Sequence, residues 1–233
     1  MAITRRTPVF LEDTVAGVTH TVAYSMVSGT ASTNRKLCIW TWGANRTTTG
    51  LTYNGVAASM VFETSAGPSS ERSQFWYIDD TNLPADTSSH NIVISWSGSC
   101  VNAGFLVWEL AGAAQGAVKS SGNNMANTAA FSISQTTVDV SAEIFVGYFR
   151  EENRTQDSEP TTPTLSASPT VVNSARLYYL TGPNPAGSMT DNWTTGSGAV
   201  QAGGAIEIAA AAVAALSWGA QLSDQLNRIV QGN

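Results

Sequence analysis

The residues best suited to chemistry are two acidic pairs, each placed after a predicted strand. Asp79-Asp80 follows RSQFWYI, and Glu151-Glu152 follows AEIFVGYF. Carboxylates in a loop are ligands for Ca²⁺, although the EF-hand spacing is missing. Glycoside hydrolysis needs two carboxyl groups about 5 to 10 Å apart across a bond, whereas neighbours at a strand end point apart. We interpret both pairs as turn residues and leave calcium binding at Asp79 and Asp80 open.

Histidine and cysteine give no second candidate for catalysis. His20 and His90 stand in Thr/Ser/Asn surroundings without a partner at a metal-binding spacing. The sequence contains no Gly-x-Ser-x-Gly elbow and no phosphate-binding glycine loop. Two cysteines, Cys38 and Cys100, are too few for a disulfide framework, and we expect both to be buried free thiols. The sequence therefore predicts no catalytic residue, no metal and no cofactor.

The charge balance limits the partners of the chain. Charged residues are 12% of the 233 residues, about half the usual share, and the net charge is −6. An acidic, charge-poor surface is not attracted to nucleic acid or to an anionic membrane. The N-terminus has no signal-peptide core, and no apolar run is long enough to span a bilayer. We therefore expect no nucleic acid and no membrane among the partners, and synthesis in a cytoplasm.

Aromatic pairs on predicted strands suggest a binding surface. Side chains alternate across a strand, so one ring of each pair points to the core and the other points outward. An outward ring among Asn, Ser and Thr suits a sugar or a protein surface. The alternative is that the outward rings pack under loops or against a neighbouring sheet. The candidate glycan-binding residues are Trp76, Tyr77, Tyr178 and Tyr179.

The elements that carry these residues are β-strands. RKLCIWTW, residues 35–42, places Cys38 and Trp40 on one face and Leu37 and Ile39 on the other. Asn54-Gly55 lies between two short apolar runs and predicts a tight hairpin. Further strands are predicted at 72–78, 90–96, 105–110, 142–149, 174–180 and 204–210.

Two stretches about a hundred residues apart repeat one pattern. SWSGSCVNAGF (95–105) and NWTTGSGAVQAGG (192–204) share Trp, a Gly/Ser turn, Val, an amide residue, Ala and Gly. The strand before each unit ends in Asn-Arg-Thr, at 45–47 and 153–155. A repeat of about 100 residues is too long for a solenoid or a propeller. The fold class predicted is all-β: a jelly-roll-like two-sheet β-sandwich built from two pseudo-repeated four-strand halves.

The two ends of the chain differ from this sandwich. Residues 1–33 are predicted as an N-terminal arm and first strand, 34–212 as the β-sandwich, and 213–233 as a helical tail. Within the tail, residues 216–230 carry a helical apolar stripe that needs a packing partner, either the sandwich itself or another subunit. The candidate interaction residues are Trp218, Leu222, Leu226, Ile229 and Val230.

The series TYNGVAASMV, SQFWYI and IVISWSGS, followed by a second half that ends in a Trp strand and an alternating apolar strand, resembles the lectin-like β-sandwich modules of tailed-bacteriophage virion proteins. The resemblance covers roughly residues 34–212. The family pattern carries no catalytic residues, and its modules serve as capsid decorations, fibre parts or adhesive tips. The terminal segments before 34 and after 212 resemble assembly arms.

This resemblance implies a structural virion protein, a cement or decoration protein that binds the major capsid protein without catalysis. Decoration proteins occupy three-fold positions on shells, so we expect a homotrimer. The alternative is a carbohydrate-binding attachment module of a phage tail or fibre, with a glycan as partner. A glycan hydrolase or lyase on a sandwich fold is a third alternative.

Overall fold

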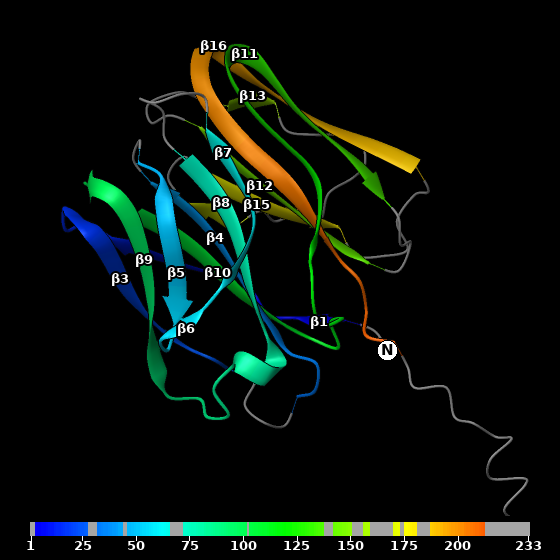
Figure 1. Ribbon diagram of the computed structural model, residues 1–233. Coiled ribbons are helices and arrows are strands. Elements are labelled where there is room, and N and C mark those ends of the chain that lie inside the picture. Colours follow the sequence, from blue (N-terminus) through cyan, green and yellow to red (C-terminus); the bar gives the residue numbers. More distant parts are fainter. Residues whose placement is uncertain are drawn as a thin grey trace, which may run out of the picture.

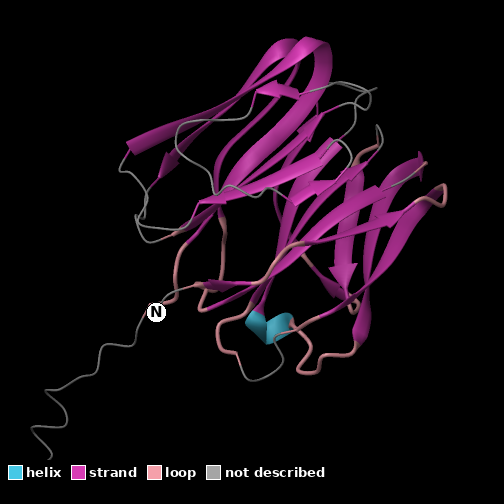
Figure 2. Cartoon of the chain, turned by 180° about the vertical axis from the view of Figure 1, so that it is seen from behind, coloured by secondary structure: helices cyan, strands magenta, loops and turns pink. Residues whose placement is uncertain are grey.

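The computed structural model describes residues 3–27, 32–43, 46–65, 72–101, 103–137, 142–150, 156–158, 170–172, 175–180 and 187–212. These residues form antiparallel β-sheets packed as a sandwich, as the sequence predicts (Figure 1). Figure 2 shows the same sheets from behind, with one 3₁₀ turn, η1 (Asp80–Asn82), as the helical element of the described part of the chain. No helix in the described residues is long and apolar enough to cross a membrane. The predicted helical tail lies outside the described residues.

Three sheets build the sandwich, which corrects the prediction of two sheets and of two four-strand halves. The small sheet has the order β3-β9-β5-β6, and the central sheet has the order β1-β10-β4-β8-β7, with β2 also paired to β10. The small sheet contains β3 (Gly17–Ser25), β5 (Thr48–Tyr53), β6 (Val56–Ala57) and β9 (Ser89–Cys100). The central sheet contains β1 (Thr4–Arg5), β2 (Val9–Asp13), β4 (Lys36–Gly43), β7 (Ser59–Ser65), β8 (Arg72–Asp79) and β10 (Ala103–Ala111).

The third sheet is formed by the second half of the chain and has the order β11-β16-β12-β15-β14, with β13 paired to β16. Its two longest strands, β11 and β16, bend together at the top of Figure 1. We call it the long-strand sheet. Its strands are β11 (Lys119–Thr137), β12 (Glu143–Arg150), β13 (Gln156–Ser158), β14 (Thr170–Val172), β15 (Ala175–Leu180) and β16 (Gly187–Ile208).

Two hydrophobic cores separate the three sheets. The first core lies between the small and central sheets and includes Leu37 and Ile39 of β4. The second core lies between the central and long-strand sheets and includes Cys38 and Trp40 of the same strand. The alternation predicted for residues 35–42 is confirmed, and both faces of β4 are buried. The central sheet is therefore the middle layer of the molecule.

The residues predicted as an N-terminal arm are integrated into the sheets. Residues 3–27 form β1, β2 and β3, which pair with β10 and β9 of the same chain. Arg5 of β1 also forms an ion pair with Glu143 of β12, with Nη1 and Oε2 3.2 Å apart. Burial raises the pKa of Glu143, and Arg5 acts against that rise. The start of the chain thus ties the central sheet to the second half.

The predicted hairpin at Asn54-Gly55 is confirmed. Asn54 and Gly55 have φ angles of 52° and 76°, and β5 pairs with β6 across them. Positive φ at both central positions is the requirement of a type I′ turn, which Asn-Gly satisfies at low cost. The local sequence is therefore sufficient to explain this turn.

The strand pairings confirm an internal repeat. In the first half, Gly17 pairs with Cys100 and Thr19 pairs with Ser95, so residues 96–99 lie opposite Val18 alone. In the second half, Thr128 pairs with Ala199 and Ala130 pairs with Thr194, so residues 195–198 lie opposite one residue, 129. The same bulge therefore occurs at the same place in both halves.

A third strand joins each bulge in the same register. Thr48 and Gly50 of β5 pair with Trp96 and Ser95, and β13 repeats this arrangement 108 residues later. There Gln156 pairs with Thr195 and Ser158 with Thr194, again with an irregularity between the two pairs. Strand β5 follows Asn45-Arg46-Thr47 in the sequence, and β13 follows Asn153-Arg154-Thr155. The repeated tripeptide thus marks equivalent strands.

The pairings also correct the alignment of the two tryptophans. Val101–Gly104 corresponds to Val200–Gly203, as predicted, but Trp96 corresponds to Thr195 and not to Trp193. The segment 96–104 crosses from β9 to β10, whereas 193–203 lies within the single strand β16. The expected pair of strand–turn–strand corners is therefore one corner and one bend of a continuous strand.

Both cysteines are buried and free, as the sequence predicts. Cys38 lies in the second core and Cys100 in the first, and burial raises the pKa of the Cys38 thiol to about 12. We expect alkylation at pH 8 to leave the folded protein unlabelled and to label two thiols after unfolding. Mass spectrometry under non-reducing conditions is the measurement. An unfolded chain that takes up no label and is lighter by two hydrogens would show a disulfide instead.

Candidate functional site

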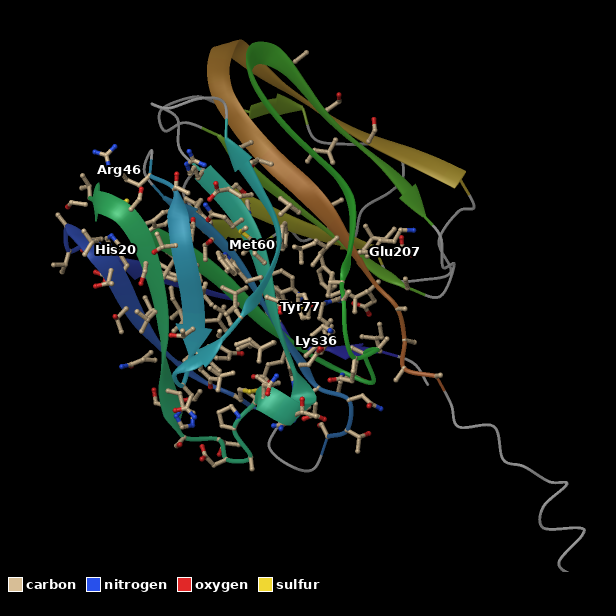
Figure 3. The ribbon with its side chains drawn as sticks, in the orientation of Figure 1. His20, Lys36, Arg46, Met60, Tyr77 and Glu207 are labelled. Atoms are coloured by element: carbon tan, nitrogen blue, oxygen red, sulfur yellow. The ribbon has the colours of Figure 1, made fainter. Side chains whose placement is uncertain are left out.

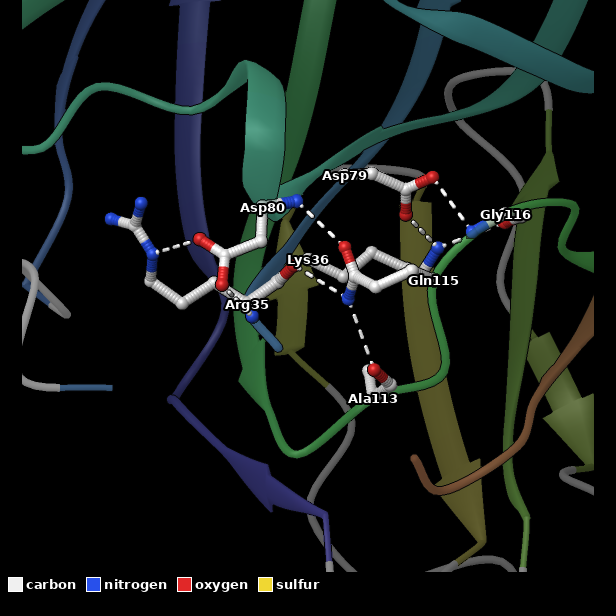
Figure 4. A network of polar contacts seen from close by, with 7 residues as sticks. All are labelled: Arg35, Lys36, Asp79, Asp80, Ala113, Gln115 and Gly116. Carbon is white, nitrogen blue, oxygen red and sulfur yellow. Dashed lines mark hydrogen bonds and ion pairs between the residues drawn. The ribbon is translucent and has the colours of Figure 1, made fainter. Parts of the chain in front are cut away.

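The two acidic residues that end β8 belong to a polar network at one end of the central sheet (Figure 4). Lys36 Nζ donates to the Asp79 carboxylate and to the carbonyl of Gly116, the latter at 3.1 Å. The backbone N–H of Gly116 donates to the other Asp79 oxygen at 2.8 Å. Lys36 is 1% exposed, and its ammonium also lies 4.3 Å from the ring centre of Tyr77 (Figure 3). Asp79 thus balances a buried charge.

Asp80 binds a different cation. Its carboxylate accepts from Arg35 Nε at 2.6 Å and from the Arg35 backbone N–H at 3.1 Å. Its own backbone N–H donates to Gln115 Oε1, and Gln115 Nε2 donates to the carbonyls of Arg35 and Ala113. Gln115 and Gly116 lie in the connection between β10 and β11. The network therefore fixes the segment that joins the two halves.

This geometry favours a structural role for the acidic pair. The two carboxylates point to different cations, Lys36 and Arg35, and do not face each other across an open space (Figure 4). Among the described residues, no three His, Cys, Asp or Glu side chains are grouped so as to hold a metal ion. Glu151 and Glu152 lie outside the part of the chain that the structure describes.

His90 belongs to an exposed Ser-His-Asp cluster that the sequence analysis did not identify. His90 Nε2 lies 2.9 Å from Asp86 Oδ1 and 3.2 Å from Ser88 Oγ, and Ser88 also donates to Asp86. Hydrogen bonds from Ser88 and His90 lower the pKa of Asp86 to about 2. A catalytic triad uses two different ring nitrogens for the serine and the aspartate. Here one nitrogen contacts both, so the cluster orders the turn before β9.

His20 is buried in the first core beside Asp13. The His20 side chain is fully buried, and its Nδ1 lies 3.7 Å from Asp13 Oδ2 (Figure 3). Asp13 accepts hydrogen bonds from the backbone N–H groups of Val15 and Thr21, and these bonds lower its pKa. Asp13 thus connects the end of β2 to the outer edge of β3.

The predicted glycan-binding aromatics do not form an exposed surface in the part of the chain that the structure describes. Trp76 is 5% exposed and lies in the first core, where its Nε1 donates to Thr41 Oγ1. Tyr77 is half-buried beside Lys36. The central sheet is covered on both faces, so consecutive aromatics on β8 both meet protein. Tyr178 and Tyr179 lie on β15, and their side chains are outside the described set, as are Trp218, Leu222, Leu226, Ile229 and Val230.

Three exposed valines lie at the corner where β2 meets β3 and β9 meets β10. Val15, Val18 and Val101 are 73%, 54% and 71% exposed. The pairings of Gly17 with Cys100 and of Asp13 with Ala103 place the two chain segments that carry them side by side. We call these three residues the valine corner. The sequence analysis named Val101 only as part of the repeated pattern and did not predict exposed apolar groups here, because an isolated valine beside a turn carries no periodic signal.

No protein-family model matches the sequence, and comparisons with curated proteins and with solved structures give no significant match.

Proposed function

We propose that this chain is a non-catalytic binding protein of a virion shell, a cement or decoration protein. The sequence resemblance to phage virion modules supplies the class of protein. The observation that carries the proposal is the internal repeat, which gives one chain the same bulge twice, once at a strand–turn–strand corner and once at a bend of a continuous strand. A shell is a lattice of identical subunits, and a cement protein joins neighbouring copies. Two equivalent bulges suit two equivalent neighbours.

The valine corner is the first of these two contacts. Exposed apolar groups gathered at one place are typical of protein interaction sites, whereas single exposed valines are not. Val200 stands at the position in β16 that corresponds to Val101, so the sequence repeats an apolar residue at the second bulge. The major capsid protein is the proposed partner, and the virion is the proposed location.

The charged residues support binding without turnover. Lys36, Arg35, Asp79 and Asp80 neutralise one another in the network that holds the two halves together. The Ser88-His90 contact lacks the geometry of a relay. The ion pairs and hydrogen bonds of these groups stabilise the fold, and this role explains their presence.

The test is co-sedimentation of the purified protein with shells assembled from the major capsid protein proposed as its partner. We expect V18D and V101D each to weaken binding at least tenfold, since a charge in an apolar contact is desolvated without a partner. V27D is the matched control, because Val27 is 62% exposed and lies two residues beyond the far end of β3. Equal binding by all three variants would contradict the proposal, as would absence of binding by the unchanged protein.

The proposed homotrimer is tested separately by sedimentation equilibrium. The tail stripe, Trp218, Leu222, Leu226, Ile229 and Val230, is the proposed subunit or shell contact. Deleting residues 216–233 is expected to reduce the trimer or the shell affinity while leaving the sheets folded. An unchanged mass together with unchanged shell binding would favour the alternative, a carbohydrate-binding module, which a glycan array would then examine.

A further inference from the structure

Four buried polar atoms of the small sheet have no hydrogen-bond partner in the protein. They are Nδ1 and Nε2 of His20, Oγ1 of Thr48 and Nε1 of Trp96. The three side chains come from β3, β5 and β9, and β9 pairs with both of the other strands. His20 is fully buried and Trp96 is 4% exposed. The four atoms therefore belong to one small region of the fold.

The strand register places the three side chains on one face. Thr48 is directly opposite Trp96, and His20 is opposite Ile94, two residues from Trp96. Residues opposite each other in antiparallel strands point to the same side of the sheet. Trp96 and Ile94 both lie in the first core. His20, Thr48 and Trp96 thus face the interior at the end of the first core that adjoins the bulge.

Leaving such atoms unpaired is costly. A buried donor or acceptor without a partner costs roughly 1–3 kcal/mol, and buried polar groups in native proteins are paired with protein or with ordered water. Four such atoms would cost a large share of the stability of a domain, which is about 5–15 kcal/mol. A partner that lies between these side chains is therefore expected.

The donors and acceptors define the chemical class of that partner. A neutral imidazole offers one donor and one acceptor, the indole offers a donor, and the hydroxyl offers both. An anion is disfavoured, because it would lie near the negative Asp13 carboxylate, which is 3.7 Å from His20 Nδ1. A cation is also disfavoured, because it would face the N–H groups of Trp96 and His20, which are hydrogen-bond donors. A neutral molecule that both donates and accepts satisfies the whole set.

We propose that the first core holds ordered water molecules that link His20, Trp96 and Thr48. Neighbouring strands are about 4.8 Å apart, so β3 and β5 are roughly 10 Å apart on either side of β9. One water joins groups about 5–6 Å apart through two hydrogen bonds. The chain of contacts from His20 to Thr48 therefore takes at least two waters.

The second half supplies the substitution for a test. Thr19 and Ala130 are equivalent in the two bulges, so Phe131 occupies the position of His20. The sequence of the second half thus carries an apolar ring at this position of the repeat. H20F removes the donor and acceptor of His20, H20L does so with a smaller side chain, and H20Q retains both.

The first measurement is urea unfolding of the full chain. We expect H20F and H20L each to raise the unfolding equilibrium constant at least tenfold, because both remove the partner of the bound water. H20Q is expected to stay within a few-fold of the unchanged protein. Overpacking depends on the size of the new side chain, whereas loss of the bound water does not. The two apolar variants of different size therefore distinguish the two effects. If both are as stable as the unchanged protein, or more stable, the site is dry and the proposal is wrong.

The second measurement detects the water directly. In ¹⁵N-labelled protein, the indole N–H of Trp96 is expected to show a cross-peak to long-lived bound water, with W96F used to assign the signal. The cross-peak should weaken in H20F and persist in H20Q. A Trp96 indole without contact to bound water would overturn the proposal, as would a crystal structure in which another protein group bonds His20 and Trp96.

Discussion

Replacing Gly204 by valine is expected to lower the free energy of unfolding by about 3 kcal/mol, at the upper end of the usual cost of overpacking. Gly204 lies on β16 and faces the second core, where a Cβ atom would lie 2.2 Å from the ring of Phe62. Phe62 packs against Phe75, with ring centres 5.2 Å apart, and cannot withdraw without displacing that ring. Urea unfolding followed by tryptophan fluorescence is the measurement.

Gly50→Val is the matched control for this substitution. Gly50 lies in β5, and a Cβ atom there would meet nothing within 4 Å. Valine is favoured in strands, so the free energy of unfolding is expected to stay the same or to rise. Equal losses from the two substitutions would show that glycine is required for its backbone freedom and not for the approach of Phe62.

The same reasoning explains how the two halves recognise each other. Gly147 of β12 receives Trp40 and Phe75 of the central sheet, where a Cβ atom would lie 2.7 Å and 2.9 Å from their rings. Trp108 and Phe145 pack beside them, with ring centres 5.0 Å apart. Large rings on the central sheet thus occupy the spaces that glycines leave in the long-strand sheet. Packing in the second core therefore depends both on the large rings of the central sheet and on the glycines of the long-strand sheet.

Asp79→Ala is expected to lower the free energy of unfolding by about 3 to 5 kcal/mol, because it leaves a buried cation without its counter-charge. Lys36 is 1% exposed, and Asp79 is the carboxylate that its ammonium contacts. Loss of Asp79 also removes the acceptor of the Gly116 N–H and loosens the connection between the halves. Unfolding in urea at pH 7 measures the loss.

The double variant Lys36→Met with Asp79→Leu separates charge from packing. Replacing both members of a buried ion pair by apolar groups of similar size is often neutral or stabilising. We therefore expect the double variant to recover most of the stability that Asp79→Ala loses. A double variant as unstable as the single one would show that the hydrogen bonds to Gly116 carry the effect.

Local patterns in the sequence determined several elements of this fold. Asn54-Gly55 specifies its turn because positive φ at two successive positions is a property of the residues themselves. The alternation in 35–42 specifies β4, because side chains alternate across any strand. The repeated Asn-Arg-Thr and Val-x-Ala-Gly sequences marked equivalent positions in the two halves.

Other elements carried too little local signal. Strand β11, the second longest of the described strands, was not predicted. Its sequence is rich in Ser, Asn and Thr. A run of polar residues lacks the alternation of apolar and polar side chains that predicts a strand. It forms because β16 supplies a partner along its whole length. The backbone pairing, which is non-local, decides this strand.

The residues of the candidate site were likewise predicted only in part from the sequence. The sequence identified Asp79 and Asp80 as residues of interest, but their partners Lys36, Arg35 and Gln115 come from distant positions and meet them only in the folded chain. It left open whether the outward rings of the aromatic pairs bind a ligand or pack against a neighbouring sheet, and for the pair Trp76-Tyr77 the long-strand sheet covers the second face of the central sheet. Periodicity states which residues share a face of a strand. Only the packing of three sheets decided what each face meets, because that depends on contacts between residues far apart in the sequence.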